Sequence, residues 1–165
     1  MERLPYIDVH EVEVAADLNA TWQAIVRVGR EALGGTGQAW LGRVLAVDPP
    51  REAGEWSPDP RPGAALCGFA VHEVRPGELL SLRGSHRFSR YRLDFELAPA
   101  DGGRARLRAR SWAEFPGLGG AVYRTLVIRS GGHRLIVRRL LRQVATTART
   151  TVATGPAARE AERLR

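Results

Sequence analysis

The stretch that decides the fold is Trp112-Ala113-Glu114-Phe115-Pro116-Gly117-Leu118-Gly119-Gly120, followed by Val122-Tyr123-Arg124 and by the segment that opens Gly132-His133-Arg134-Leu135. The first part predicts an apolar strand that ends at a Pro/Gly-rich corner, because proline cannot donate to a strand ladder. The long apolar segment after it predicts a helix that closes the domain. Four strand-like segments and an early helix precede this stretch. We therefore expect an α+β fold in which an antiparallel sheet wraps around the last helix.

Composition bounds the class of protein. A chain of 165 residues, 44% of them hydrophobic, can form one domain with a sizeable core. We expect this domain to span residues 1–147, with a disordered or weakly helical tail over 148–165. No apolar run approaches the roughly 18–20 residues of a membrane span, and the first residues lack the apolar core of a signal peptide. The single cysteine, Cys67, excludes an internal disulfide, so the cytoplasm is the expected location.

The charge of the chain is uneven. All 25 basic residues are arginine, and the segment from Arg104 to Arg149 holds eleven arginines and one acid, Glu114. Such a segment can meet phosphate groups on nucleic acid or on a lipid surface. The alternative is a solvated arginine face without a partner.

The N-terminal part of the chain predicts a strand and a helix. Alternation over residues 6–14 indicates the strand. Asp17 or Asn19 can then cap a helix that carries Trp22 on its apolar face and ends at Gly34-Gly35. A second short helix is expected over residues 38–47.

Residues 48–63 hold five of the ten prolines, a composition that excludes a helix and a central strand. We expect a loop before the main sheet. Trp56 within it is predicted to be an exposed aromatic that either covers a pocket mouth or packs on the outside.

The main sheet is predicted from four segments joined by short hairpin connections: residues 65–75, 78–87, 90–98 and 104–115. Because side chains alternate between faces, Arg104, Arg106, Arg108 and Arg110 form a ladder on one face. Pairing of charged faces places this ladder beside Asp94 and Glu96, which explains it without nucleic acid.

The same alternation predicts the inner face. Counting back across the two preceding hairpins places His86 opposite Tyr91, Val71 opposite Leu82 and Cys67 opposite His86. The inner face is then expected to carry an apolar set and, toward one end, a polar row. The apolar set is Phe69, Val71, Leu80, Leu82, Leu93, Phe95 and Leu107. The polar row is Cys67, His86, Tyr91 and Ser111.

The last helix is expected to restart near Ser130-Gly131-Gly132 and to run to about Ala145. A wide apolar face is predicted from Leu135, Ile136, Val137, Leu140, Leu141 and Val144. Arg134, Arg138 and Arg142 recur at every fourth position, so we expect one solvent-facing stripe.

This order of elements resembles the helix-grip fold of the SRPBCC superfamily, which includes START lipid-transfer domains, plant allergens and polyketide cyclases. The residues that carry the resemblance are the strand-to-helix entry Val12-Glu13-Val14-Ala15-Ala16-Asp17 and, more specifically, Phe115–Gly120 with Tyr123 and His133–Ile136. The latter stretch resembles an uncharacterised branch of the superfamily, in which a proline often precedes the histidine where this chain has Gly131-Gly132. The resemblance covers about residues 6–145 and implies a pocket between sheet and helix, without naming a ligand.

The polar row has two interpretations, one functional and one purely structural. His86 with Tyr91 can transfer protons near neutral pH, and Cys67 beside His86 can form a nucleophile pair. In the structural interpretation, these residues lie near the hairpin ends, are partly exposed to solvent and have no chemical role. His133 is expected to be structural, and His10 and His72 are expected to be outward-facing or edge residues. No metal site and no cofactor are expected, because the histidines are scattered and no nucleotide-binding loop is present.

We therefore expect a protein that binds a small apolar or aromatic molecule in a cavity between the sheet and the last helix. The predicted ligand-binding residues are Phe69, Leu82, His86, Tyr91, Phe95, Leu107 and Ser111. One alternative is an enzyme like a polyketide cyclase or dehydratase. A further alternative is a basic protein that binds nucleic acid or an anionic surface, with nucleic acid the less expected partner. The sequence indicates no oligomeric state.

Overall fold

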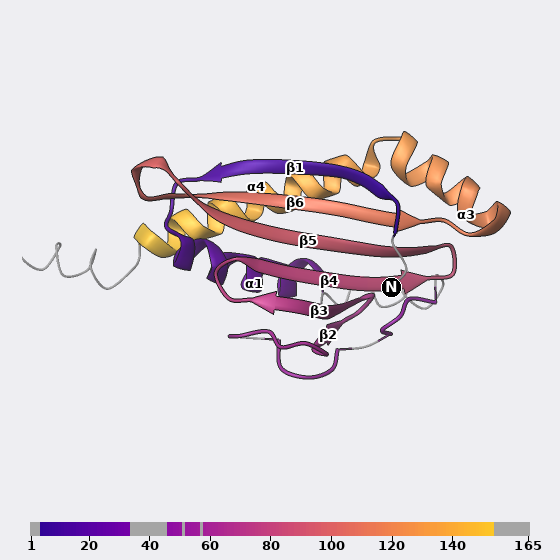
Figure 1. Cartoon of the computed structure of the whole chain (residues 1–165), viewed down its shortest axis with the longest axis horizontal. Helices are drawn as coiled ribbons and strands as arrows, with labels where there is room; N and C mark the ends of the chain where they lie inside the picture. The colour runs from indigo at the N-terminus through magenta and orange to yellow at the C-terminus, as the bar shows by residue number, and fades with distance from the viewer. Residues whose placement is uncertain (1–3, 34–45, 51, 57, 154–165) are drawn as a thin grey trace, which may run out of the picture.

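The computed structural model describes residues 4–33, 46–50, 52–56 and 58–153. Its centre is a six-stranded antiparallel sheet of order β1-β6-β5-β4-β3-β2, with α1 and α4 packed together on one face (Figure 1). The strands are β1 (Tyr6–Val14), β2 (Ala65–Leu66), β3 (Phe69–Arg75), β4 (Leu79–His86), β5 (Ser89–Ala100) and β6 (Arg104–Glu114). The helical elements are α1 (Leu18–Leu33), η2 (Asp101–Gly103), α3 (Gly117–Arg124), the π-helical η3 (Thr125–Arg129) and α4 (Gly132–Ala153). The predicted α+β architecture is confirmed.

The predicted faces of the sheet are also confirmed. Asp94 pairs with Arg110 and Glu96 with Arg108 across β5 and β6. On the far side of β6, Arg108 donates to Glu11 and Arg104 donates to Glu13, both on β1. The arginine ladder thus lies between two rows of acids on the outer face, the face that α1 and α4 leave open. Exposed pairs of this kind contribute little to stability, because water and salt screen them.

The register of the β4–β5 hairpin differs from the prediction by two residues. His86 pairs with Ser89 and Gly84 with Tyr91, because the turn is Arg87-Phe88 and not Phe88-Ser89. A shift of two residues keeps every side chain on its predicted face. In β3, Val71 does pair with Leu82, and a bulge follows before Glu73.

The predicted pairing of Cys67 with His86 is wrong. The chain turns at Cys67-Gly68, where Gly68 has a φ of +81°, and β2 folds back on β3 with Leu66 opposite Phe69. Glycine adopts this left-handed conformation without the cost that a side chain adds.

Helix α1 begins where predicted, since the Asp17 side chain accepts a 2.7 Å hydrogen bond from the backbone N–H of Ala20. Trp56 packs against this helix and is only 5% exposed. Its indole N–H donates to the carbonyl of Val26 at 2.9 Å, and its ring lies where a Cβ on Gly29 would be 3.2 Å away. The prediction of an exposed Trp56 is therefore wrong. The expected helix over 38–47 falls mostly outside the described residues.

Helix α4 restarts after Gly131, where φ is +79°, and runs to Ala153, beyond the predicted end near Ala145. Ala148 is fully buried, and the hydroxyls of Thr150 and Thr151 bond to carbonyls one turn earlier, so small residues extend the helix. This extension passes the expected domain end at residue 147, and residues 154–165 lie outside the described part.

The predicted apolar face of α4 is wrong at its start. Leu135 and Ile136 are 67% and 66% exposed, whereas Val137 is buried. A helix turns by about 100° per residue, which rotates Leu135 and Ile136 away from the buried side. The buried side is formed by Val137, Leu140, Leu141, Val144 and Ala148. Arg134, Arg138 and Arg142 are exposed as predicted. Within the described residues, no helix is long and apolar enough to cross a membrane.

Candidate functional site

The inner face of the sheet changes character along the strands. In its middle, Leu80, Phe95 and Ala109 lie side by side and are fully or nearly buried. One row further, Leu82, Leu93 and Ser111 are paired, and in the next row Gly84, Tyr91 and Ala113. We call this last region, with His86 beyond it, the hairpin end. Aromatic and polar side chains replace the aliphatic core there.

Six rings gather at the hairpin end and form what we call the aromatic cluster: Phe69, His86, Phe88, Tyr91, Phe115 and Tyr123. The imidazole of His86 lies with its centroid 4.7 Å from Tyr123 and 5.7 Å from Tyr91. Tyr123 comes from α3, which follows the end of β6 and leads through η3 to α4 (Figure 1). Tilted ring pairs at these distances are favourable beyond the area that they bury.

Two glycines let α3 approach this cluster. A Cβ on Gly119 would be 3.1 Å from the Phe88 ring, and one on Gly120 would be 2.5 Å from the Phe115 backbone. The Gly119-Gly120 pair in the fold-deciding stretch therefore has a packing reason, since no larger residue fits at Gly120 without a backbone shift.

A third glycine positions Tyr91. A Cβ on Gly84 would be 1.9 Å from the carbonyl oxygen of Gly68 and 2.8 Å from the Tyr91 ring. The bare backbone at Gly84 lets the Tyr91 hydroxyl donate a 2.7 Å hydrogen bond to the Gly68 carbonyl. The Tyr91 hydroxyl hydrogen is thus already used in a hydrogen bond, and this bond fixes the orientation of the ring.

The protonation of His86 follows from its contacts. Its Nδ1 accepts a 3.1 Å hydrogen bond from the backbone N–H of Phe88, so in the neutral ring the proton sits on Nε2. Burial lowers the pKa of His86 below 6.5, which favours this neutral form at pH 7. Burial likewise raises the pKa of Tyr91 and of Tyr123, so both phenols keep their protons. The hairpin end therefore offers neutral hydrogen-bond donors in an apolar setting.

A second polar cluster borders the first. His133, near the start of α4, has its Nε2 3.1 Å from the Ser111 hydroxyl and 3.3 Å from Asp8 Oδ1. The other Asp8 oxygen lies 3.2 Å from His10 Nε2. Both contacts of His133 use one ring nitrogen, whereas a catalytic triad needs the two nitrogens of one histidine to bond different partners. The arrangement instead holds α4 to β1 and β6.

A cleft of about 540 Å³ opens beside the aromatic cluster, between the sheet end and α3 with η3. Its apolar lining includes Ile7, Ala113, Phe115, Ala121 and Ile128. Arg124 and Arg129 stand on its helical side. Phe115 belongs to the cluster and also lines the cleft, so the two regions meet at this residue.

No model of a known protein family matches the sequence, and neither does any curated protein. Solved structures do match. The Zhui aromatase/cyclase from Streptomyces sp. R1128 superposes with a TM-score of 0.53 at 14% identity, over 92% of this chain and 98% of that one. Protein MLL2253 from Mesorhizobium loti gives 0.51 at 16% identity, over 87% and 98%. DynU16 of the dynemicin biosynthetic locus gives 0.50 at 15% identity over 93% of this chain, which spans 49% of DynU16.

This chain has the helix-grip fold. Its structural neighbours are helix-grip proteins of the SRPBCC superfamily, as the resemblance implied. Identities this low show a shared fold and carry no activity over.

The helix-grip frame places the seven predicted site residues in three groups. His86, Tyr91 and Phe69 lie together in the aromatic cluster. Ser111 faces His133 in the second cluster. The remaining three, Leu82, Phe95 and Leu107, belong to the packed core.

Sequence reasoning did not assign Tyr123 or Asp8 to a site. Tyr123 follows the Pro/Gly corner in the sequence. The apolar pattern of that segment does not show that its side chain points back toward the sheet. Asp8 lies on the same face of β1 as Val12 and Val14. The alternation along this strand could therefore have predicted that Asp8 faces the inside of the sheet. Within the described residues, no group of three or more His, Cys, Asp or Glu side chains is placed to hold a metal ion.

Proposed function

We propose that this protein binds a small apolar or aromatic molecule at the hairpin end of the grip. The observation that carries the proposal is that the aromatic cluster adjoins the apolar cleft against α3 through Phe115. Small-molecule sites are mostly apolar concavities with a few polar groups that fix orientation. We assign this role to His86, because its Nε2–H is a donor in a half-buried setting.

The other predicted residues support the same site. Phe69 and Tyr91 wall it with rings 5.1 Å apart. We assign Leu82, one row from Tyr91, to the apolar surface next to the cluster, and Ser111 to a polar edge through its contact with His133. Phe95 and Leu107 would support the site from the packed core. With one cysteine and no internal disulfide to form, we propose that the protein works in the cytoplasm.

Fluorescence titration with prodan, a neutral naphthalene ketone, tests the proposal. Its carbonyl can accept the His86 hydrogen bond, so His86→Ala is expected to weaken binding about threefold to tenfold, in line with roughly 0.5–1.5 kcal/mol for one hydrogen bond. The matched control is His72→Ala, on the exposed part of β3. Equal affinities for the wild type and the His86 variant, or an equal loss in the control, overturn the proposal.

The alternative function is a cyclase or dehydratase that acts on a polyketide-like substrate. The observation in its favour is that two phenols flank one neutral imidazole. Tyr91 already donates to Gly68, so His86 and Tyr123 are the proton-transfer candidates. Incubation with a poly-β-ketone analogue, followed by mass spectrometry, separates the two functions. A cyclised or dehydrated product that disappears with His86→Gln supports the enzyme, and prodan binding without turnover supports the binding protein.

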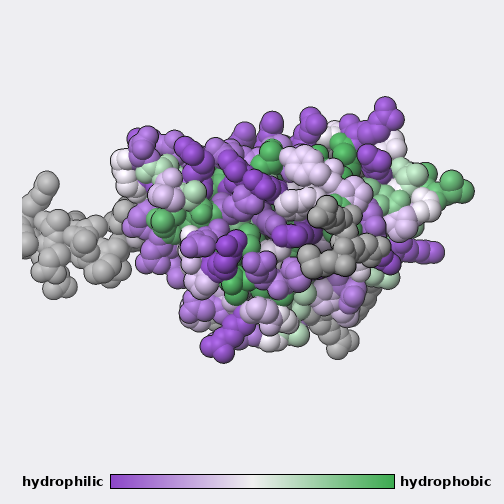
Figure 2. Space-filling model, viewed as in Figure 1, coloured by the Kyte–Doolittle hydropathy of each residue, from purple (hydrophilic) through white to green (hydrophobic). Residues whose placement is uncertain are grey.

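A further alternative is binding to an anionic surface. Leu118, Val122 and Leu126 recur at every fourth residue of α3 and η3 and are exposed, with Leu118 at 89%. Figure 2 shows hydrophobic side chains at this end of the molecule. Exposed apolar residues combined with exposed arginines, such as Arg134 and Arg138 of α4, are typical of helices that lie on anionic lipid. Cosedimentation with anionic but not neutral vesicles supports this alternative, and salt-dependent binding to DNA alone points to nucleic acid instead.

A further inference from the structure

The outer face of the sheet, opposite the face that α1 and α4 cover, holds a second cleft. It has a volume of about 630 Å³. Leu4, Pro49, Ala70 and Trp112 contribute apolar surface. The charged lining residues are Arg83, Arg90 and Arg92 from β4 and β5 and one acid, Asp48, so three arginines face one carboxylate. Arg92 pairs with Trp112 across the outer face, and Arg83 with Arg92. Tyr91 and Gly84 border this cleft as well. The experiment below therefore has to separate it from the hairpin end.

The three arginines differ in how their charge is used. Arg92 donates twice to Asp94, at 2.8 and 2.5 Å, and stacks over the Trp112 ring at 5.0 Å. Arg90 donates to Glu114 at 3.0 Å. Among the described residues, Arg83 forms no ion pair, and its buried Nε–H has no hydrogen-bond partner. Leaving a buried charged donor unpaired is costly, so Arg83 is the guanidinium that gains most from an anion.

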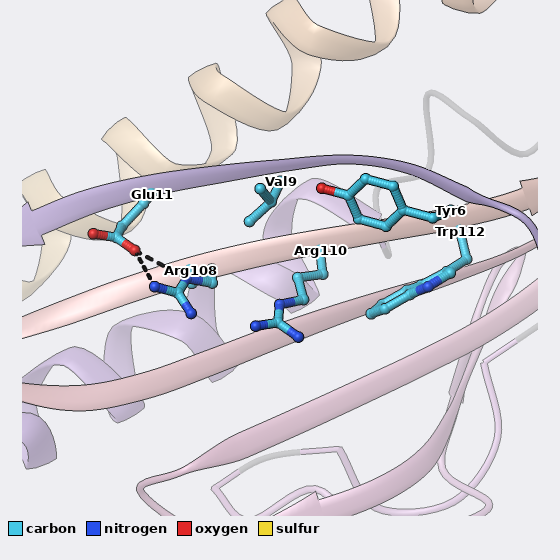
Figure 3. A pocket seen from close by; sticks show the side chains of 6 residues that line it. All are labelled: Tyr6, Val9, Glu11, Arg108, Arg110 and Trp112. Atoms are coloured by element: carbon cyan, nitrogen blue, oxygen red, sulfur yellow. Dashed lines mark hydrogen bonds and ion pairs between the residues drawn. The ribbon is translucent and has the colours of Figure 1, made fainter.

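The neighbouring pocket shows the contrast (Figure 3). It has a volume of about 340 Å³ and also contains Trp112, which thus stands between the two. Its Arg108 is bound to Glu11 by hydrogen bonds of 2.9 and 2.6 Å. Its Arg110 lies 3.3 Å from Glu96. Both guanidinium groups there are neutralised by acids of the same sheet, so this pocket has no charge left for a ligand.

The pKa of a neighbouring histidine is affected by two of the cleft's arginines. The pKa of His72 on β3 is lowered, first by burial and then by Arg83 and Arg92, which outweigh the opposing Glu73 and Asp94. At His72, the charges of Arg83 and Arg92 therefore act more strongly than those of Glu73 and Asp94. Positive potential with an apolar, partly aromatic wall favours an anion that carries a flat apolar body.

We propose that this outer cleft binds a small aromatic carboxylate. The carboxylate pairs with the Arg83 fork, and the ring lies against Trp112 and Pro49. Arginine is suited to this role because its planar donors match the two oxygens of a carboxylate. This proposal is independent of the one for the hairpin end, because it does not require a ligand to bind there.

Calorimetric titration with 2-naphthoate tests the proposal on the full chain. Arg83→Gln is expected to weaken binding at least tenfold, and Arg83→Lys at least threefold, because lysine keeps the charge and loses the fork. The matched control is Arg75→Gln, which removes the same charge from an exposed side chain of β3 outside the cleft and is expected to stay within twofold. The amide 2-naphthamide, without the charge, is expected to bind at least tenfold more weakly than 2-naphthoate to the wild type.

Three results overturn the proposal: a 2-naphthoate affinity that Arg83→Gln leaves within twofold, the same loss in Arg75→Gln, or a loss caused by His86→Ala of the grip. If Arg83→Gln fails to fold by circular dichroism, the comparison of Arg83→Lys with wild type decides alone. Prodan binding reports on the grip separately, so either site can fail without the other.

Discussion

The two ends of the inner face differ in what they are built to do. At one end, Val14, Leu107 and Val144 are fully or almost fully buried between the sheet and the helices. At the hairpin end, His86 and Tyr91 are only half-buried, and three glycines allow close approach of rings and backbone. The difference indicates that the first end stabilises the fold. The hairpin end has fewer packed aliphatic side chains and instead has hydrogen-bond donors in fixed positions beside a cleft.

The largest effect is expected in the middle of the core. Phe95→Ala should lower the free energy of unfolding by roughly 3–5 kcal/mol, because the side chain is almost fully buried and the cavity cannot collapse. Phe69→Ala, in the half-buried cluster, should cost less than half as much. Urea unfolding of both variants measures the difference. Equal losses would mean that the hairpin end is as tightly packed as the core.

The next effect is steric. Gly84→Ala places a methyl group 1.9 Å from the Gly68 carbonyl oxygen, so the backbone or Tyr91 must move. We expect a loss of roughly 1–3 kcal/mol, as overpacking costs elsewhere, together with weaker prodan binding. Ser85→Ala on the adjacent position should change neither. A Gly84→Ala variant with wild-type stability and affinity would show that the close approach is not real.

A smaller effect isolates one hydrogen bond. Tyr91→Phe removes the donor to the Gly68 carbonyl and should cost roughly 0.5–1.5 kcal/mol in thermal or urea unfolding. Tyr6→Phe removes a hydroxyl from an exposed ring and should leave stability unchanged. If the two variants unfold alike, Tyr91 is not held in the way described.

The smallest effect is a pH dependence. The pKa of His86 is lower in the folded protein than the ordinary 6.5, so below pH 6.5 the unfolded chain binds the proton more readily. Stability is therefore expected to fall as the pH drops from 6.5 toward the lowered pKa. Above pH 6.5 both states are neutral, and no effect is expected. Unfolding curves of wild type and His86→Gln between pH 7.5 and 5 should converge at low pH, and parallel curves would contradict a buried neutral imidazole.

Much of the fold could be predicted from alternation and turn residues. Those patterns place Phe95 inside and Arg108 outside, and they survive the two-residue error in the β4–β5 register because parity is kept. They do not determine which pair closes a hairpin, and so Cys67 was placed opposite His86 when the chain in fact turns there.

The other differences depend on contacts between distant segments. Trp56 is buried because Gly29 on α1 offers a gap for its ring, which the loop composition does not reveal. His133 meets Asp8 and Ser111 because α4 restarts at Gly131-Gly132, directly before it. For the candidate site, the sequence predicted that His86 and Tyr91 lie close together, but Tyr123 reaches them only through the fold of α3.

Methyl and amide NMR during a prodan titration tests the central claim most directly, because it reports on both ends of the inner face at once. We predict shifts for Ala113, Ala121 and Ile128 around the cleft and for Leu82 beside the cluster, with no shifts for Val14 and Ala148 at the core end. His86→Ala should reduce the shifts at the first group. Shifts centred on Val14 and Ala148, or confined to outer-face residues such as Val9, would contradict the assignment of ligand binding to the hairpin end.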